Sequence, residues 1–136
     1  MQTVTVKVLI NAPIEKAWEC FTSPEHITQW NFASPEWHCP TAEHDLKVGG
    51  KLKYHMAAKD GSMAFDYTAT FTTIKENDLL AYTLDDNRKV SIAFTSENGQ
   101  TKVVEQFETE DENSIEMQKA GWQAILNNFK AHVEAH

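Results

Sequence analysis

Residues 90–107 read VSIAFTSENGQTKVVEQF, and this stretch decides the fold of the 136-residue chain. On both sides of Asn98-Gly99, apolar and polar side chains alternate, which is typical of half-buried β-strands. Asn-Gly is strongly favoured in two-residue hairpin turns, because both central residues of such a turn have positive φ. The stretch therefore predicts a β-hairpin with one inward-facing side. The side chains expected on that side are Val90, Ile92, Phe94, Thr101, Val103, Glu105 and Phe107.

Four further strands are expected N-terminal to this hairpin, from the same alternation of apolar and polar residues. Asp60-Gly61 and Asn77-Asp78 supply the turn signals between three of them. Residues 31–41 are expected to form a loop, because Pro35 and Pro40 interrupt regular structure. The expected strands cover residues 3–10, 51–56, 63–74 and 80–84.

Three helices are expected where the apolar spacing changes to three or four residues. The first begins at Pro13. Proline lacks a backbone N–H group, and the N–H group of the first helical residue would have no hydrogen-bond partner within the helix, so no bond is lost there. The second covers about Pro24–Trp30 and follows Ser23, a residue type that caps helices. The third begins after Asn113 or Ser114. Its apolar positions are Ile115, Trp122, Ile125, Phe129 and Val133.

This order of elements predicts a single α+β domain over residues 1–136. The formal net charge of -8 disfavours a nucleic-acid partner and an anionic membrane surface. The sequence shows neither a signal peptide nor a run long enough to span a membrane. Cys20 and Cys39 form no CxxC motif, so free thiols and a cytoplasmic location are expected.

Four motifs occur in order along nearly the whole chain. They are the strand-to-helix junction of residues 10–18, Ser23-Pro24-Glu25 followed by Trp30, the paired-glycine turn of residues 45–51, and Gly121-Trp122 with Ile125. Together they resemble the heat-shock-protein-90 ATPase activator homologues (Aha-type) of the START-like, or SRPBCC, superfamily. The resemblance implies a helix-grip fold, in which a curved antiparallel sheet wraps around a long C-terminal helix.

The helix-grip fold also implies a cavity between the concave face of the sheet and the last helix. Aromatic and aliphatic walls suit an apolar ligand. The alternative is that these side chains fill the space and form an ordinary core. The expected ligand-binding residues are Trp30, Trp37, Tyr54, Phe65, Tyr67, Phe71, Tyr82, Phe94, Glu105, Phe107, Gly121, Trp122 and Ile125.

Glu105 is the most informative single residue, because strand parity places it on the same side as Val103 and Phe107. A buried, unpaired carboxylate costs several kcal/mol, so it would be neutralised, paired or functional. One hypothesis makes Glu105 a polar anchor in the cavity wall. The alternative places it at a sheet edge, in water or paired with a basic side chain.

No other constellation indicates a catalytic, cofactor or metal site. The chain has no nucleophile elbow, phosphate loop or dinucleotide fingerprint. His38, Cys39, Glu43 and His44 lie close in sequence, but their spacing matches no zinc motif. We therefore expect no catalytic residue, no cofactor and no metal.

The sequence leaves three functions open. The preferred one is a non-enzymatic binding module for an apolar or lipid-like molecule. The family resemblance also implies a co-chaperone of a heat-shock-protein ATPase, and its superfamily includes polyketide cyclase and aromatase-like enzymes. An enzyme would need acid–base groups in the cavity, and Asp66 alternates out of phase with Phe65 and Tyr67. The protein is expected to be a monomer or a dimer, since an exposed edge strand can pair two copies.

Overall fold

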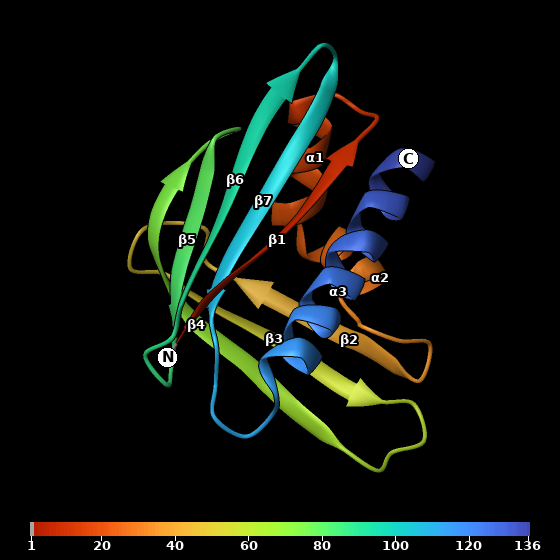
Figure 1. Ribbon diagram of the computed structural model, residues 1–136, viewed down its shortest axis with the longest axis vertical. Helices are drawn as coiled ribbons and strands as arrows, with labels where there is room; N and C mark the ends of the chain where they lie inside the picture. The colour runs from red at the N-terminus through yellow and green to blue at the C-terminus, as the bar shows by residue number, and fades with distance from the viewer. Residues whose placement is uncertain (1) are drawn as a thin grey trace.

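The computed structural model describes residues 2–136 and contains one antiparallel sheet covered by helices (Figure 1). The order of the elements confirms the α+β helix-grip architecture expected from the sequence. None of the described helices is long and apolar enough to cross a membrane. The elements are β1 (Thr3–Ile10), α1 (Ile14–Thr22), α2 (Pro24–Trp30), β2 (Trp37–His44), β3 (Lys51–Ala58), β4 (Ala64–Lys75), β5 (Leu79–Leu84), β6 (Lys89–Glu97), β7 (Gln100–Glu108) and α3 (Ile115–Ala135).

The sheet runs in the order β1-β7-β6-β5-β4-β3-β2, with every neighbouring pair antiparallel. Strands β2 to β7 follow one another as a meander, and β1 joins the free edge of β7. The β6–β7 hairpin turns at Asn98 (φ 52°) and Gly99 (φ 82°), as the Asn-Gly signal predicts. The predicted inward side of the hairpin is also confirmed, since Phe94 pairs with Val103 and Val90 pairs with Phe107.

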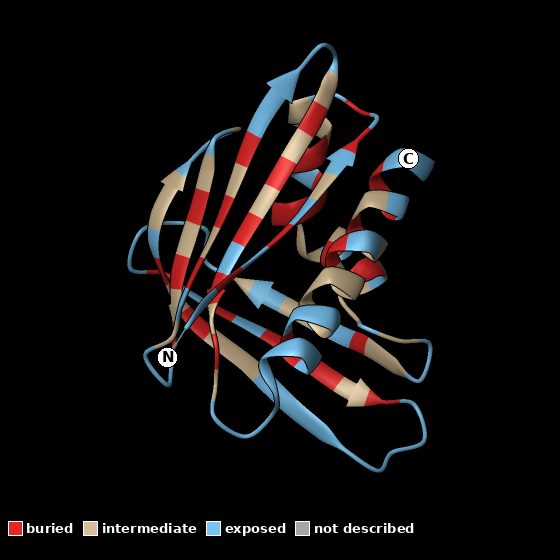
Figure 2. Cartoon of the chain, in the orientation of Figure 1, coloured by how far each residue is buried: buried red, intermediate tan, exposed pale blue. Residues whose placement is uncertain are grey.

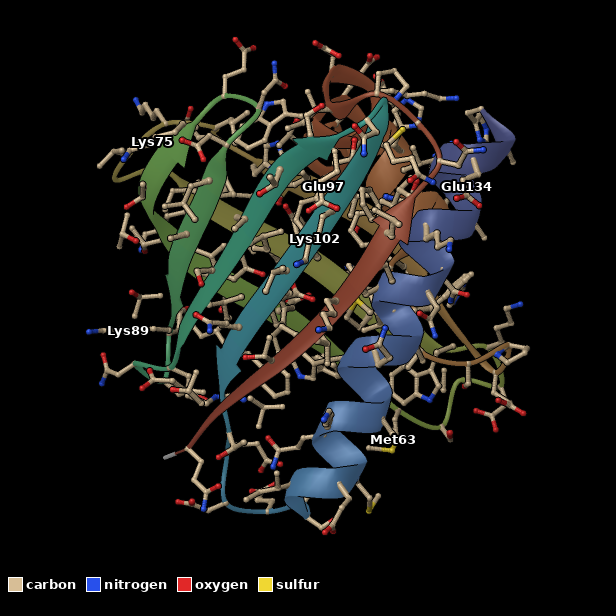
Figure 3. The ribbon with its side chains drawn as sticks, turned by 45° about the horizontal axis from the view of Figure 1, so that its top comes forward. Met63, Lys75, Lys89, Glu97, Lys102 and Glu134 are labelled. Atoms are coloured by element: carbon tan, nitrogen blue, oxygen red, sulfur yellow. The ribbon has the colours of Figure 1, made fainter. Side chains whose placement is uncertain are left out.

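The sheet curls into a half-barrel, and all three helices lie on its concave side (Figure 1). Buried and exposed residues alternate along the strands, so one face of the sheet is apolar and the other faces solvent (Figure 2). Charged side chains such as Glu97 and Lys102 project from the outer face of β6 and β7 (Figure 3). Ser114 caps α3 by accepting a hydrogen bond from the Met117 backbone N–H.

Two predictions about local structure are wrong. The expected loop at residues 31–41 contains the start of β2, whose pairing with β3 shifts between His38 and Thr41. Pro40 lies at this irregularity on the edge strand of the sheet, where a missing N–H group removes no essential ladder bond. Pro13 is not the first helical residue, because it has an extended backbone and immediately precedes α1.

Aromatic side chains fill one end of the space between the sheet and the helices. The ring of Phe21 lies 5.1 Å from Trp30, 5.7 Å from Phe94 and 5.0 Å from Phe129, measured between centroids. Trp18 also packs edge-on against Phe94 at 5.2 Å. This aromatic cluster of Trp18, Phe21, Trp30, Phe94 and Phe129 joins α1, α2 and α3 to β6.

Truncating the centre of this cluster should therefore destabilise the whole domain. Phe129 is fully buried and contacts rings from both α1 and α2. We expect Phe129→Ala to lower the free energy of unfolding by about 3–5 kcal/mol in urea denaturation. Met117→Ala is the control on the same helix, because Met117 is 65% exposed and should change stability by less than about 0.5 kcal/mol. Equal effects of the two substitutions would show that the cluster does not anchor α3.

Candidate functional site

The other end of the same space is hollow. A cavity of about 170 Å³ lies between the inner face of the sheet and α3. Its walls are mainly aromatic and aliphatic, and they come from α1, α2, α3 and strands β3, β4, β5 and β7. The lining residues are Phe21, Trp30, Asn31, Tyr54, Met56, Phe65, Tyr67, Leu80, Tyr82, Glu105, Trp122, Ile125 and Leu126.

The fold brings together eight of the thirteen residues that the sequence analysis selected. Five others that line the cavity were missed. Met56 and Leu80 share the strand parity of selected residues, and Phe21 and Leu126 lie at helical spacing, so these four had a usable signal. Asn31 follows α2 in the segment taken for a loop and had none. The eight residues are Trp30, Tyr54, Phe65, Tyr67, Tyr82, Glu105, Trp122 and Ile125.

The five remaining selected residues lie outside the cavity lining. Phe94 belongs to the aromatic cluster, and Phe71 is buried against Tyr82. Phe107 lies behind the wall, where its ring stacks on Trp122 with centroids 4.1 Å apart and planes 7° from parallel.

Trp37 and Gly121 also lie outside the cavity lining. Trp37 is half-buried on β2, with its ring 6.0 Å from that of Phe65. No atom lies within 4 Å of where a side chain would begin on Gly121, so this glycine neither touches a bulky neighbour nor lines the cavity.

Glu105 lies in the interior of the sheet and not at an edge. It pairs with Val6 of β1 on one side and with Ile92 of β6 on the other, and both neighbours are buried. Only 6% of Glu105 is exposed, and the residue lines the cavity. The alternative of a wet or salt-bridged edge residue is therefore excluded by its position.

Burial raises the pKa of Glu105 from its ordinary value of 4.5 to about 8. Desolvation is the cause, and among residues 2–136 no cation or hydrogen-bond donor stabilises the charged form. The carboxyl group is therefore mostly protonated at neutral pH. In that state it presents an O–H donor and a carbonyl oxygen to an otherwise apolar space.

Three tyrosines place their hydroxyl groups in the same region. The Tyr67 and Tyr82 hydroxyl oxygens lie 3.0 Å apart, and the Tyr54 hydroxyl lies 2.9 Å from Nδ1 of His44. Burial raises the pKa of both Tyr67 and Tyr82, and at Tyr82 the charges of Tyr67 and then of Glu105 add to this effect. The tyrosines are therefore neutral, and each hydroxyl has a hydrogen-bond partner, unlike the carboxyl group of Glu105.

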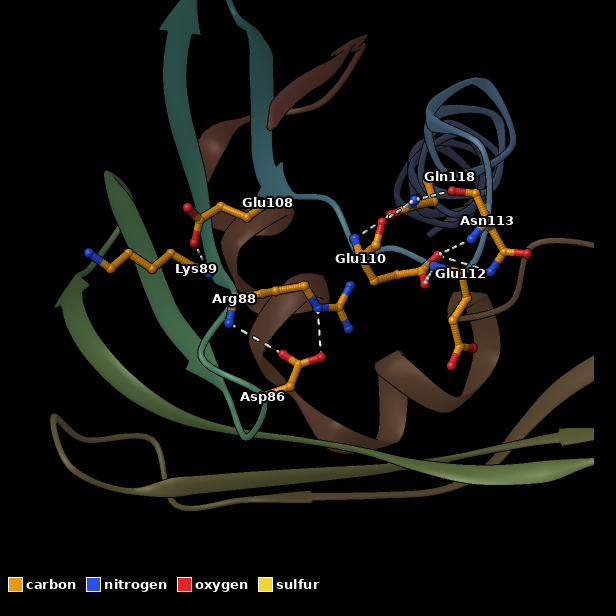
Figure 4. Close-up of polar contacts among 8 residues, drawn as sticks. All are labelled: Asp86, Arg88, Lys89, Glu108, Glu110, Glu112, Asn113 and Gln118. Carbon is orange, nitrogen blue, oxygen red and sulfur yellow. Dashed lines mark hydrogen bonds and ion pairs between the residues drawn. The ribbon is translucent and has the colours of Figure 1, made fainter. Parts of the chain in front are cut away.

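Phe65 and Trp122 form the boundary between the cavity and a polar surface groove. Both residues line the two spaces, and Phe65 is 51% exposed. On the groove side, Arg88 Nε contacts the Asp86 carboxylate at 2.8 Å (Figure 4). The Glu110 carboxylate accepts hydrogen bonds from the backbone and side chain of Asn113, which holds the β7–α3 loop at the rim.

The cavity contains little that can carry out catalysis. Its lining includes no histidine, cysteine, lysine or arginine, and its titratable groups are the carboxyl of Glu105 and three tyrosine hydroxyls. His38, Cys39, Glu43 and His44 lie elsewhere, with His44 bonded to Tyr54 and the Cys39 thiol directed to the carbonyl oxygen of Thr41. The geometry suits binding and orientation of a small molecule.

The similarity of this chain to solved structures extends over almost its whole length. An AHSA1-like protein from Aeromonas hydrophila is 43% identical with a TM-score of 0.92, over 98% of this chain and 93% of that one. A protein from Cytophaga hutchinsonii is 50% identical with a TM-score of 0.85, over 98% and 92%. A protein from Chromobacterium violaceum, at 22% identity and a TM-score of 0.90 over 98% and 99%, shares the fold.

No curated protein matches the chain. The family described as activator of Hsp90 ATPase homolog 1-like protein matches residues 11–134. This match covers the first strand-to-helix junction, the complete meander and nearly all of α3. The chain therefore belongs to the activator of Hsp90 ATPase homolog 1-like family.

Proposed function

We propose that this protein is a binding module for a small, largely apolar molecule that carries one hydrogen-bond acceptor. The observation that supports this proposal is the unpartnered carboxyl group of Glu105 in an aromatic cavity. The carboxyl oxygens are not fully enclosed but are open to the cavity, where the lack of a hydrogen-bond partner costs up to about 1–3 kcal/mol. A ligand with an acceptor atom removes this cost by accepting a hydrogen bond from the protonated Glu105 carboxyl group. A purely apolar ligand does not.

The cavity volume limits the size of the ligand. An apolar protein cavity of about 150 Å³ holds a molecule of the size of benzene, and the cavity here measures about 170 Å³. Trp30, Tyr67 and Trp122 offer ring faces and edges to an aromatic guest. The expected ligand is therefore a molecule with a single aromatic ring, or with an aliphatic chain of similar volume, that carries a carbonyl or ether oxygen. Longer lipid-like molecules require Phe65 and Trp122 to move apart.

Co-chaperone activity is the other function that the family suggests, and it makes a different demand on the molecule. A chaperone partner needs an exposed surface and is indifferent to what fills the cavity. Stimulation of an Hsp90 ATPase that persists in a variant with a blocked cavity would favour that function over ligand binding.

A matched pair of ligands tests the role of Glu105. Acetophenone and toluene have similar ring systems, but only acetophenone has a hydrogen-bond acceptor. We expect acetophenone to bind about five- to tenfold more tightly than toluene, which corresponds to one hydrogen bond of about 1–1.5 kcal/mol. Chemical-shift titration of the Trp30 and Trp122 indole N–H signals measures both affinities and locates the ligand.

Glu105→Leu is the variant for this comparison. It should bind both ligands with nearly equal affinity, because the donor is gone and the wall remains apolar. A preference for acetophenone that survives in Glu105→Leu would contradict the proposed anchor, and absence of binding by either ligand would contradict the binding module.

The raised pKa of Glu105 also predicts how stability depends on pH. Between about pH 4.5 and 8 the folded protein keeps a proton that the unfolded chain has lost. The free energy of unfolding should therefore fall as pH rises, by up to about 1.4 kcal/mol per pH unit. Glu105→Gln should remove this slope, as measured by urea denaturation across the same pH range.

Glu97→Gln is the matched control for the pH series. Glu97 is exposed on β6 and projects from the outer face (Figure 3). This variant should keep the slope of the unaltered protein, and contributions from histidines cancel in the comparison. The contrary result is an equal change with pH in the free energies of unfolding of the unaltered protein and of Glu105→Gln. That result would mean that Glu105 is ionised in the folded state.

A further inference from the structure

A second group of chemically active side chains gathers where the three helices converge. Cys20 comes from α1, His26 from α2 and His132 from α3. The Cys20 sulfur and one nitrogen of each imidazole all lie within 4.8 Å of one another. None of these residues lines the cavity, so the cluster is separate from the proposed ligand site.

The two imidazoles point one ring nitrogen each toward the same space, where a cation could bind both. Nδ1 of His26 lies 2.8 Å from Nε2 of His132, so a single proton bridges the two nitrogens. The imidazole that accepts this hydrogen bond directs a nitrogen lone pair into the space between the rings, and a metal ion binds to such a lone pair.

We propose that Cys20, His26 and His132 form a binding site for a divalent transition-metal ion. One thiolate and two neutral imidazoles are a donor set that suits Zn²⁺, Co²⁺ or Cu²⁺ and does not suit Mg²⁺ or Ca²⁺. The ion would take the place of the proton between the two imidazoles. The displaced proton moves to the outer nitrogen of the imidazole that held it, so each neutral imidazole then carries one proton on its outer nitrogen. The Cys20 thiol releases its proton to solvent.

The distances require little movement of the backbone. With zinc–nitrogen bonds of about 2.0–2.1 Å and zinc–sulfur bonds of about 2.3 Å, tetrahedral ligand atoms lie about 3.3–3.6 Å apart. The two imidazole nitrogens therefore separate by about 0.5 Å, and the Cys20 sulfur, now within 4.8 Å of them, approaches by up to about 1.2 Å. Side-chain rotations at the ends of three fixed helices can provide this change.

His136 lies beside the cluster, and its Nδ1 is hydrogen-bonded to the carbonyl oxygen of His132 at 2.8 Å. Its ring lies 4.1 Å from that of His132 and 6.0 Å from that of His26, and His136 itself is exposed. Burial, followed by the charge of Glu19, raises the pKa of the Cys20 thiol, and Lys16 on the same helix acts in the opposite direction. The thiol is therefore protonated without a metal ion, and coordination has to displace that proton.

Cobalt is the most informative probe, because coordination by a thiolate gives a charge-transfer band in the near ultraviolet. We expect the full chain to bind one Co²⁺ with this band, and Zn²⁺ to displace it. Substitution of a residue that only hydrogen-bonds to a metal ligand already lowers the affinity for the metal about 10- to 100-fold. Cys20→Ser and His26→Asn should therefore lower Co²⁺ affinity by about 100-fold or more, and Cys20→Ser should also abolish the band.

Two matched variants serve as controls. Cys39→Ser alters the other buried thiol, and His55→Asn alters a half-exposed histidine that pairs with Asp66 on the outer face. Both should bind Co²⁺ like the unaltered protein. Because Cys20 is buried, Cys20→Ser is judged only if its thermal midpoint shows a folded protein, whereas the half-exposed His26 tolerates substitution. Absence of the thiolate band, or unchanged affinity in His26→Asn, would overturn the proposal.

Discussion

The apolar face of one strongly curled sheet has to be kept from water, and the rest of the structure depends on how three helices cover it. A single helix is too narrow to cover seven strands, so α1 and α2 are needed beside α3 (Figure 1). The coverage is uneven. At the α1 and α2 end, five aromatic rings fill the space, whereas the region beneath the middle of α3, at Trp122, Ile125 and Leu126, retains a cavity. The cavity thus follows from the number and placement of helices.

Glu105 is costly in this arrangement, and its surroundings show why the cost persists. A leucine at this position would pack against Val6 and Ile92 across the sheet, and folding would need no proton uptake. Instead a carboxyl group occupies the centre of the wall, and burial alone raises its pKa. Functional sites often contain groups that an otherwise consistent fold holds at an energetic disadvantage. The proposed function rests on this exception within a regular apolar face.

The sequence predicted the elements well because their signals are local. Asn98-Gly99 and the alternation around it determine the hairpin, and Pro24 marks the start of α2 correctly. The prediction failed at β2, since Pro40 was judged by its general tendency and the edge position that tolerates it depends on the whole sheet. Strand parity placed Glu105 inward beside Ile92 of the same hairpin, but its neighbour on the other side, Val6 of β1, lies far away in sequence. Whether Phe94 fills a core or lines a cavity depends on how α1 packs, which no local pattern encodes.

Cys20 and His132 illustrate the same limit more strongly, because 112 positions separate them and only the packing of α1 against α3 unites them. This packing also relates the metal-site cluster to the cavity. Trp30 donates a hydrogen bond from its indole N–H to the Cys20 carbonyl oxygen at 3.0 Å, and the same indole lines the cavity. Its ring contacts Phe129, three residues before His132 on α3. A shift of α1 or α3 at the cluster would therefore reach the cavity wall through Trp30, so the two sites share one structural element although they share no ligand-contacting side chain.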